Sequence, residues 1–140
     1  MILLGKILGW LIISAFALAL LNYPVKLVNR KLVSRLQPQS RGRLAYQAFM
    51  KAVVRWHHYF ALLAVVLLLA HFLVQFSQYG IRPSGVVAGA LLLIQVALGA
   101  FGTYIRKKKH TAWFYFHRAT AVLMLAAFAV HIFRIWWILR

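Results

Sequence analysis

The sequence predicts an all-α membrane protein, a four-transmembrane-helix bundle that forms a single domain over residues 1–140. Three observations lead to this fold class. The chain is 64% hydrophobic and only 12% charged, which is not typical of water-soluble domains. It contains four long apolar runs, each near the ~20 residues that a helix needs to cross the bilayer core. None of these runs alternates polar and apolar residues, so we do not expect strands.

The four spans follow one another along the chain. They are predicted at about residues 3–21, 56–76, 86–104 and 113–137. The first has features of a secretion signal, including the early Lys6, but its apolar run is long for a signal. We therefore expect it to be retained as a helix, which gives an even number of spans and places both termini on one side.

The positive charge of the chain predicts its orientation. The net charge is +17, with no Asp or Glu. In a soluble protein this balance would indicate nucleic acid, but in a membrane protein the positions of the cations matter more, and we expect no nucleic-acid partner. Thirteen of the seventeen cations lie in the loop 23–55, or in and just after the loop between the third and fourth spans. The positive-inside rule makes that face cytoplasmic. It predicts an integral, multi-pass protein of the plasma (inner) membrane with both termini outside.

The basic loop contains a segment with helical periodicity. In VKLVNRKLVSRL, residues 25–36, five apolar side chains share one helical sector and four cations lie mostly opposite. Two interpretations are open: a basic amphipathic helix on the inner leaflet, or a solvated loop that only sets the topology. A linker with Pro and Gly follows at 37–43. From Leu44 the helical pattern resumes, and we expect it to run into the second span without a break.

Four histidines lie in the second and fourth spans at equal spacing. His57 and His71 are fourteen residues apart, as are His117 and His131. Fourteen residues fall about 40° short of four full turns, so each pair shares one helix face, with about 21 Å between its members along the axis. Because both spans cross the membrane in the same direction, His57 would face His117 near the inner surface. His71 would face His131 in the outer half, which gives two bis-imidazole sites.

These sites suit haem, whose iron takes two axial imidazoles in low-spin electron carriers. A porphyrin needs room beside each ligand, and Ala61 and Ala121 lie four residues after the inner histidines. His58 is the alternative inner ligand, but it is about 140° out of alignment with His71, and bulky side chains share its face. The predicted iron ligands are His57 and His117 for the inner haem, and His71 and His131 for the outer haem.

Other residues narrow the choice of cofactor. The chain has no Cys, which excludes cysteine-ligated iron–sulfur clusters and thioether-attached haem. A proton relay or a transition-metal site is the alternative use of the histidines, but both typically recruit carboxylates or thiolates, which are absent. Three cations could contact haem propionates or could be ordinary interfacial anchors: Arg55, Arg118 and Arg134. Glycines 85, 89, 99 and 102 predict close helix packing or backbone approach to a flat cofactor.

At these residues a family resemblance appears. The stretch HRATAVLMLAAFAVHIFR, residues 117–134, resembles a haem-ligating helix of the cytochrome b of quinol-oxidising complexes. The paired-histidine plan is also similar to the transmembrane domain of ferric reductases and NADPH oxidases. The resemblance covers spans two to four and implies a b-type dihaem membrane cytochrome: a four-helix bundle that encloses two haem b groups and moves electrons across the membrane. The chain departs from these families, because it has no acidic residue for a quinol-oxidation site and nothing that could bind a flavin or nicotinamide.

The leading functional hypothesis is therefore a redox subunit or minimal dihaem cytochrome that transfers electrons rather than a self-contained enzyme. Its partners would be the lipid bilayer and a redox donor and acceptor, either a quinone or a protein subunit, in a homo- or hetero-oligomer. One alternative is a membrane oxidoreductase acting on quinol, oxygen, superoxide or ferric iron at an exposed haem edge. Another is a non-redox membrane anchor, and a designed haem protein of the same plan is a further alternative.

Overall fold

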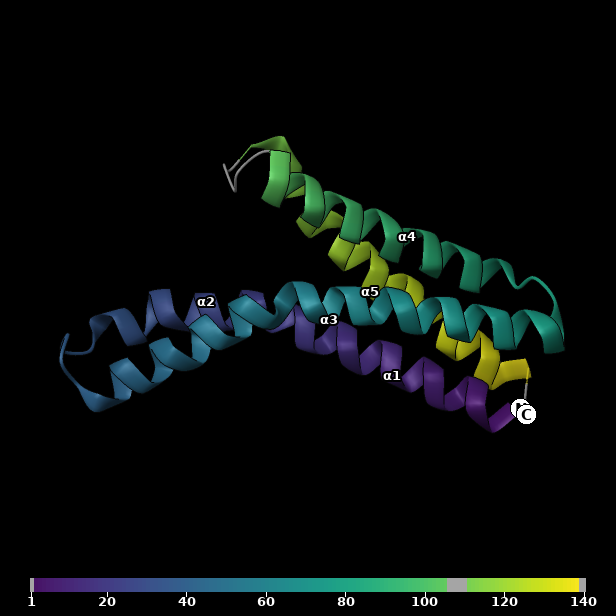
Figure 1. Cartoon of the computed structure of the whole chain (residues 1–140), viewed down its shortest axis with the longest axis horizontal. Helices are drawn as coiled ribbons and strands as arrows, with labels where there is room; N and C mark the ends of the chain where they lie inside the picture. The colour runs from purple at the N-terminus through teal and green to yellow at the C-terminus, as the bar shows by residue number, and fades with distance from the viewer. Residues whose placement is uncertain (1, 106–110, 139–140) are drawn as a thin grey trace. The chain divides into compact units, whose positions relative to one another are not determined.

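The chain is all-helical in the residues that the computed structural model describes, 2–105 and 111–138, and these contain no strand. The helices are α1 (Ile2–Leu20), α2 (Asn22–Lys31), the short 3₁₀ helix η1 (Val33–Arg35), α3 (Arg41–Tyr79), α4 (Pro83–Ala100), the π-helical turn η2 (Phe101–Ile105) and α5 (Ala112–Ile138) (Figure 1). Four of the helical stretches are long and apolar enough to cross a membrane. The first three predicted spans lie within these stretches, and the fourth, at about 113–137, lies within α5, so the all-α fold with four membrane-length helices is confirmed. The basic loop predicted between the third and fourth spans, with its cations at 106–109, lies outside the described residues.

The chain divides into two compact units, and each is described here by itself. The N-terminal unit covers Met1–His71 and contains α1, α2, η1 and most of α3. The C-terminal unit covers Phe72–Arg140 and contains the end of α3, α4, η2 and α5. The arrangement of the four spans as one bundle therefore stays a prediction.

Large apolar side chains cover the outside of the helices. Val66, Leu73 and Val122 are 57%, 66% and 66% exposed. In water, apolar surface of this extent leads to association or aggregation. In a bilayer the same surface faces hydrocarbon, which agrees with the length and composition of the helices.

In the N-terminal unit, α1 passes into α2 with only a short interruption. Pro24 has no backbone N–H to donate to the Leu20 carbonyl, and α1 ends at Leu20. Leu21 nevertheless keeps right-handed helical dihedrals of φ −55° and ψ −22°. The polypeptide therefore resumes as α2 at once, without a loop.

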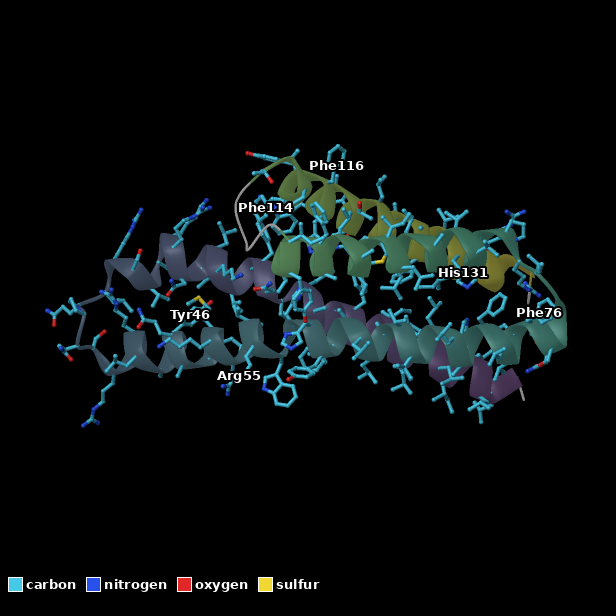
Figure 2. The ribbon with its side chains drawn as sticks, turned by 45° about the horizontal axis from the view of Figure 1, so that its top comes forward. Tyr46, Arg55, Phe76, Phe114, Phe116 and His131 are labelled. Atoms are coloured by element: carbon cyan, nitrogen blue, oxygen red, sulfur yellow. The ribbon has the colours of Figure 1, made fainter. Side chains whose placement is uncertain are left out.

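The segment predicted as a basic amphipathic helix forms α2 and η1 and lies against α3. Val25 and Val33 are buried, each 7% exposed. The Tyr46 hydroxyl of α3 donates a hydrogen bond to the Val25 carbonyl oxygen at 3.0 Å, and Figure 2 shows Tyr46 on the side of α3 that faces α2. The segment is thus helical, as the first interpretation expected, rather than a solvated loop, and it forms half of a helical hairpin with α3.

The linker at 37–43 closes this hairpin as a tight turn. Arg43 Nη1 donates to the Leu36 carbonyl oxygen at 2.9 Å, and the Arg43 backbone N–H donates to Ser40 Oγ at 3.4 Å. The second contact has the geometry of a helix N-cap, a role that Ser favours. Helix α3 begins at Arg41 and runs unbroken to Tyr79, which confirms that one helix continues into the second predicted span.

In the C-terminal unit, a glycine and a proline connect α3 to α4. Gly80 has a positive φ of 67°, which glycine adopts without steric cost, and its N–H donates to the Phe76 carbonyl oxygen at 3.0 Å. Pro83 then occupies the start of α4, where no N–H is needed. At the other end of this unit, a Cβ on the buried Gly102 would overlap the Trp113 ring. Glycine at this position therefore lets the chain before α5 pass close to that ring.

Candidate functional site

The His71 imidazole of α3 is held by the backbone of α1. Its Nδ1 lies 3.0 Å from the Gly5 carbonyl oxygen. Because a carbonyl oxygen can only accept, Nδ1 carries the proton and donates, which leaves the Nε2 lone pair for another partner. A Cβ added at Gly9, one turn further along α1, would lie 3.4 Å from His71 Cε1. The small residues of α1 therefore let its backbone approach the ring.

The His57 imidazole is held in the same way, fourteen residues earlier in α3. Its Nδ1 donates to the Ala19 carbonyl oxygen of α1 at 2.9 Å, so its Nε2 also keeps a lone pair. His57 is half-buried, whereas His58 is exposed and lies against the Tyr59 ring with 4.0 Å between ring centroids. The two adjacent histidines thus differ in environment, and within residues 2–105 and 111–138 it is His57 that hydrogen-bonds a neighbouring helix through a ring nitrogen.

The sequence reasoning missed the contribution of α1 to this site. Gly5 and Ala19, whose carbonyls accept from the two imidazoles, are themselves fourteen residues apart. That spacing equals the spacing of His57 and His71, because the two helices run side by side in opposite directions. The matching fourteen-residue spacing of small residues in α1 could have indicated where α1 approaches the two histidines. It could not identify carbonyl oxygens as the acceptors, because every residue has one.

In the C-terminal unit, the His131 imidazole of α5 is held by the first turn of α4. Its Nδ1 shares a hydrogen bond with Ser84 Oγ at 3.1 Å. A Cβ added at Gly85 would lie 3.1 Å from His131 Cε1, which is tighter than most real Cβ contacts. Gly85 was predicted to favour close packing or approach to a cofactor, and the structure places it against an imidazole.

The His117 imidazole has a different partner from the other three. Its Nε2, and not Nδ1, lies 3.3 Å from Gln95 Nε2, so the amide nitrogen donates and His117 Nε2 accepts. A Cβ on Gly99 would lie 3.4 Å from His117 Cε1. Gly85 and Gly99 repeat in α4 the fourteen-residue spacing of small residues found in α1.

Gln95 is an unusual residue for the middle of an apolar helix. Its Oε1 is buried and has no hydrogen-bond partner in the part of the chain that the structure describes. Such an acceptor is costly, typically about 1–3 kcal/mol. A half-turn of the amide exchanges its oxygen and nitrogen, so Gln95 can present either a donor or an acceptor to the imidazole. The sequence reasoning did not single out this residue, although a lone amide in a span is a readable signal.

The three predicted propionate contacts lie on the surface. Arg55 is exposed on α3 (Figure 2). Arg118 is exposed, and its guanidinium lies 5.3 Å from the centre of the Phe114 ring. Arg134 lines a largely apolar groove of about 330 Å³ together with Ser84, the partner of His131. Arg134 thus shares a groove with the hydrogen-bond partner of a predicted ligand.

The four predicted ligands are held separately, each by its own hydrogen-bond partner. Among the described residues, no group of three or more His, Cys, Asp or Glu comes together, whereas haem needs only two axial imidazoles. Three of the four imidazoles have Nδ1 bonded to a neighbouring helix, which is the usual arrangement when Nε2 binds a metal. The two predicted pairings, His57 with His117 and His71 with His131, each join the two units and stay predictions.

Comparison of the chain with known protein families, with curated proteins and with solved structures found no match.

Proposed function

We propose that this chain is a membrane cytochrome that holds two b-type haems and transfers electrons across the bilayer. The inner haem would be bound by His57 and His117, and the outer haem by His71 and His131. The observation that carries the proposal is the repeated setting of the imidazoles. Each ring has a polar partner on another helix of its own unit, α1 for His57 and His71 and α4 for His117 and His131, and each polar partner is at or near a small residue.

The residues around the histidines have a defined role in this proposal. A hydrogen bond to one ring nitrogen fixes the tautomer and orientation of an imidazole and raises its basicity as a ligand. The carbonyl oxygens of Ala19 and Gly5 do this for His57 and His71. Haem iron bound by two imidazoles exchanges one electron between its ferric and ferrous states. The apolar helices around the site keep water away from the ligands and lower the local dielectric constant.

The proposal includes an orientation and a location. The basic loops would face the cytoplasm, both termini would lie outside, and the protein would be an integral protein of the plasma (inner) membrane. The charge asymmetry of the sequence supports this orientation. With one histidine pair near each surface, a donor on one side and an acceptor on the other, either a quinone or a protein subunit, would be connected through the two haems.

Electron transfer across sealed vesicles tests the proposed function. The haem-loaded chain is reconstituted in vesicles that contain ferricyanide, and dithionite is added outside. We expect the trapped ferricyanide to be reduced several-fold faster than in protein-free vesicles. His71→Ala should remove this acceleration because the outer pair loses a ligand, whereas Ser77→Ala, a nearby exposed position, should keep it. Equal rates in vesicles with and without the protein would contradict the proposal.

A further inference from the structure

The N-terminal unit carries a helical hairpin that extends beyond the apolar part of α3. We call it the stalk and define it as residues 22–55, that is α2, η1, the turn and the first part of α3. Figures 1 and 2 both show α2 alongside this part of α3. The stalk contains none of the predicted iron ligands, and of the predicted propionate contacts it contains Arg55, at its base.

The stalk is long compared with the polar boundary of a membrane. Helix α3 has 39 residues, whereas ~20 residues are enough to cross the bilayer core. The apolar stretch of α3 begins at Trp56, so the part of α3 from Arg41 to Arg55 adds about 22 Å of helix outside that stretch. Because α3 is unbroken, the stalk cannot fold back onto the membrane without breaking the helix.

The far end of the stalk is a cationic surface. Arg30, Lys31, Arg35 and Arg41 are all exposed and lie at the end of α2, in η1 and at the start of α3. The whole chain contains no Asp or Glu side chain that could neutralise them. A surface of one sign without counter-charges attracts a partner of opposite sign and raises the rate of encounter.

Apolar side chains are interspersed with these cations. Leu32 is 62% exposed, Leu36 47% and Leu44 51%, and all three lie close in sequence to the cationic end. Exposed apolar groups clustered outside the membrane-spanning part indicate an interaction surface. A protein partner covers apolar groups with its own apolar groups and surrounds them with polar contacts, whereas a nucleic acid offers mainly phosphates to a cationic surface.

The distance from the membrane argues against lipid headgroups as the occupant. Charge interactions in physiological salt are screened over about 8 Å. Arg35 and Arg41 lie near the tip of the stalk, roughly 20 Å along the helix axis from Trp56, and even a tilt of 40° leaves about 15 Å. The headgroup layer occupies about 5–7 Å of this distance, so anionic headgroups act most strongly on the base of the stalk near Arg55, and the tip lies one to two screening lengths beyond them.

We propose that the tip of the stalk, from Arg30 to Leu44, is a docking surface for an acidic water-soluble protein. Its cations set the orientation and the rate of association, and its exposed leucines supply the apolar contact. The partner stands on the same side of the membrane as the basic loops. Docking places it on the side of the membrane nearer to His57, about 24 Å along the helix axis from that residue, the side where electrons would enter or leave if the proposed function holds.

A binding measurement in lipid nanodiscs tests the docking surface. The full chain is embedded in zwitterionic phosphatidylcholine, and a labelled plant-type ferredoxin serves as the small acidic probe at low salt. We expect binding that weakens as salt rises. Arg35→Gln with Arg41→Gln should weaken binding about tenfold, because both charges lie at the tip. Leu32→Ser with Leu44→Ser should weaken it several-fold at unchanged salt dependence.

The matched control is Lys6→Gln with Arg82→Gln, which removes two cations outside the stalk and should change binding less than twofold. Circular dichroism on each variant checks that the helices are intact. Equal weakening by the two charge pairs would overturn the proposal, since only net charge would then matter. The proposal is also overturned if binding requires anionic lipid in the nanodisc, if a single-stranded RNA binds more tightly than the ferredoxin, or if the ferredoxin does not bind.

Discussion

The two units hold their histidines by different means. In the N-terminal unit, His57 and His71 donate to backbone carbonyls of α1, those of Ala19 and Gly5. In the C-terminal unit, the partners are side chains, Ser84 for His131 and Gln95 for His117. Every residue has a backbone carbonyl, so the hydrogen bond to the imidazole depends on how closely the α1 backbone approaches and not on which residue stands there. A side-chain partner depends on the residue itself and can be removed by one substitution.

A second difference concerns which ring nitrogen is used. His57, His71 and His131 use Nδ1, whereas His117 uses Nε2. A ring nitrogen that donates leaves the lone pair of the other nitrogen for a metal, whereas His117 Nε2 accepts from Gln95, so a lone pair of this ring becomes free only if the Gln95 amide turns to accept or moves away. The inner predicted pair, His57 with His117, thus combines two differently held ligands. We therefore expect the two haem sites to differ in affinity and reduction potential.

The largest effect should come from blocking the approach of α1. Gly9→Leu places a branched side chain where even a Cβ would lie 3.4 Å from the His71 ring. Overpacking of this kind typically costs about 1–3 kcal/mol, and here α1 must move away from His71. We expect the haem content to fall from about two to about one per chain, measured by the pyridine haemochrome assay. Gly42→Leu is the matched control, because nothing lies within 4 Å of a Cβ there, and it should retain two haems.

A smaller effect should follow from removing a side-chain partner. Ser84→Ala deletes the hydroxyl that is 3.1 Å from His131 Nδ1. Loss of a ligand's outer hydrogen bond typically lowers metal affinity about 10–100-fold, so we expect weaker binding of the outer haem in a haem titration, with no loss of helix. Ser77→Ala removes a hydroxyl that donates to the Val74 carbonyl oxygen and should leave haem affinity unchanged. Unchanged haem affinity in Ser84→Ala would contradict the idea that the His131 site depends on its side-chain partner.

The helices were predictable from the sequence because hydropathy and length determine them. The four apolar runs and the continuation of the second span from the basic loop are both found in the structure. The exposure of His58 also agrees with the helical geometry that separated it from His57. These features depend on local periodicity, which a single sequence contains.

The partners of the histidines could not be derived from the same patterns. The roles of Gly5 and Ala19 depend on backbone atoms, which every residue has. The hairpin of α2 with α3 depends on a long-range contact between Tyr46 and the Val25 carbonyl. Ser84 and Gln95 carry side chains that a sequence reader would notice, but their pairing with particular histidines depends on the register between α4 and α5.

The haem content of three purified proteins tests the central claim most directly: the wild-type chain, His57→Ala and His58→Ala, each supplied with excess haem. The account predicts about two, one and two haems per chain, with low-spin b-type absorption bands that sharpen on reduction in the wild type. One haem in His58→Ala and two in His57→Ala would contradict the ligand assignment. A colourless wild-type protein would contradict the proposal that this chain is a cytochrome.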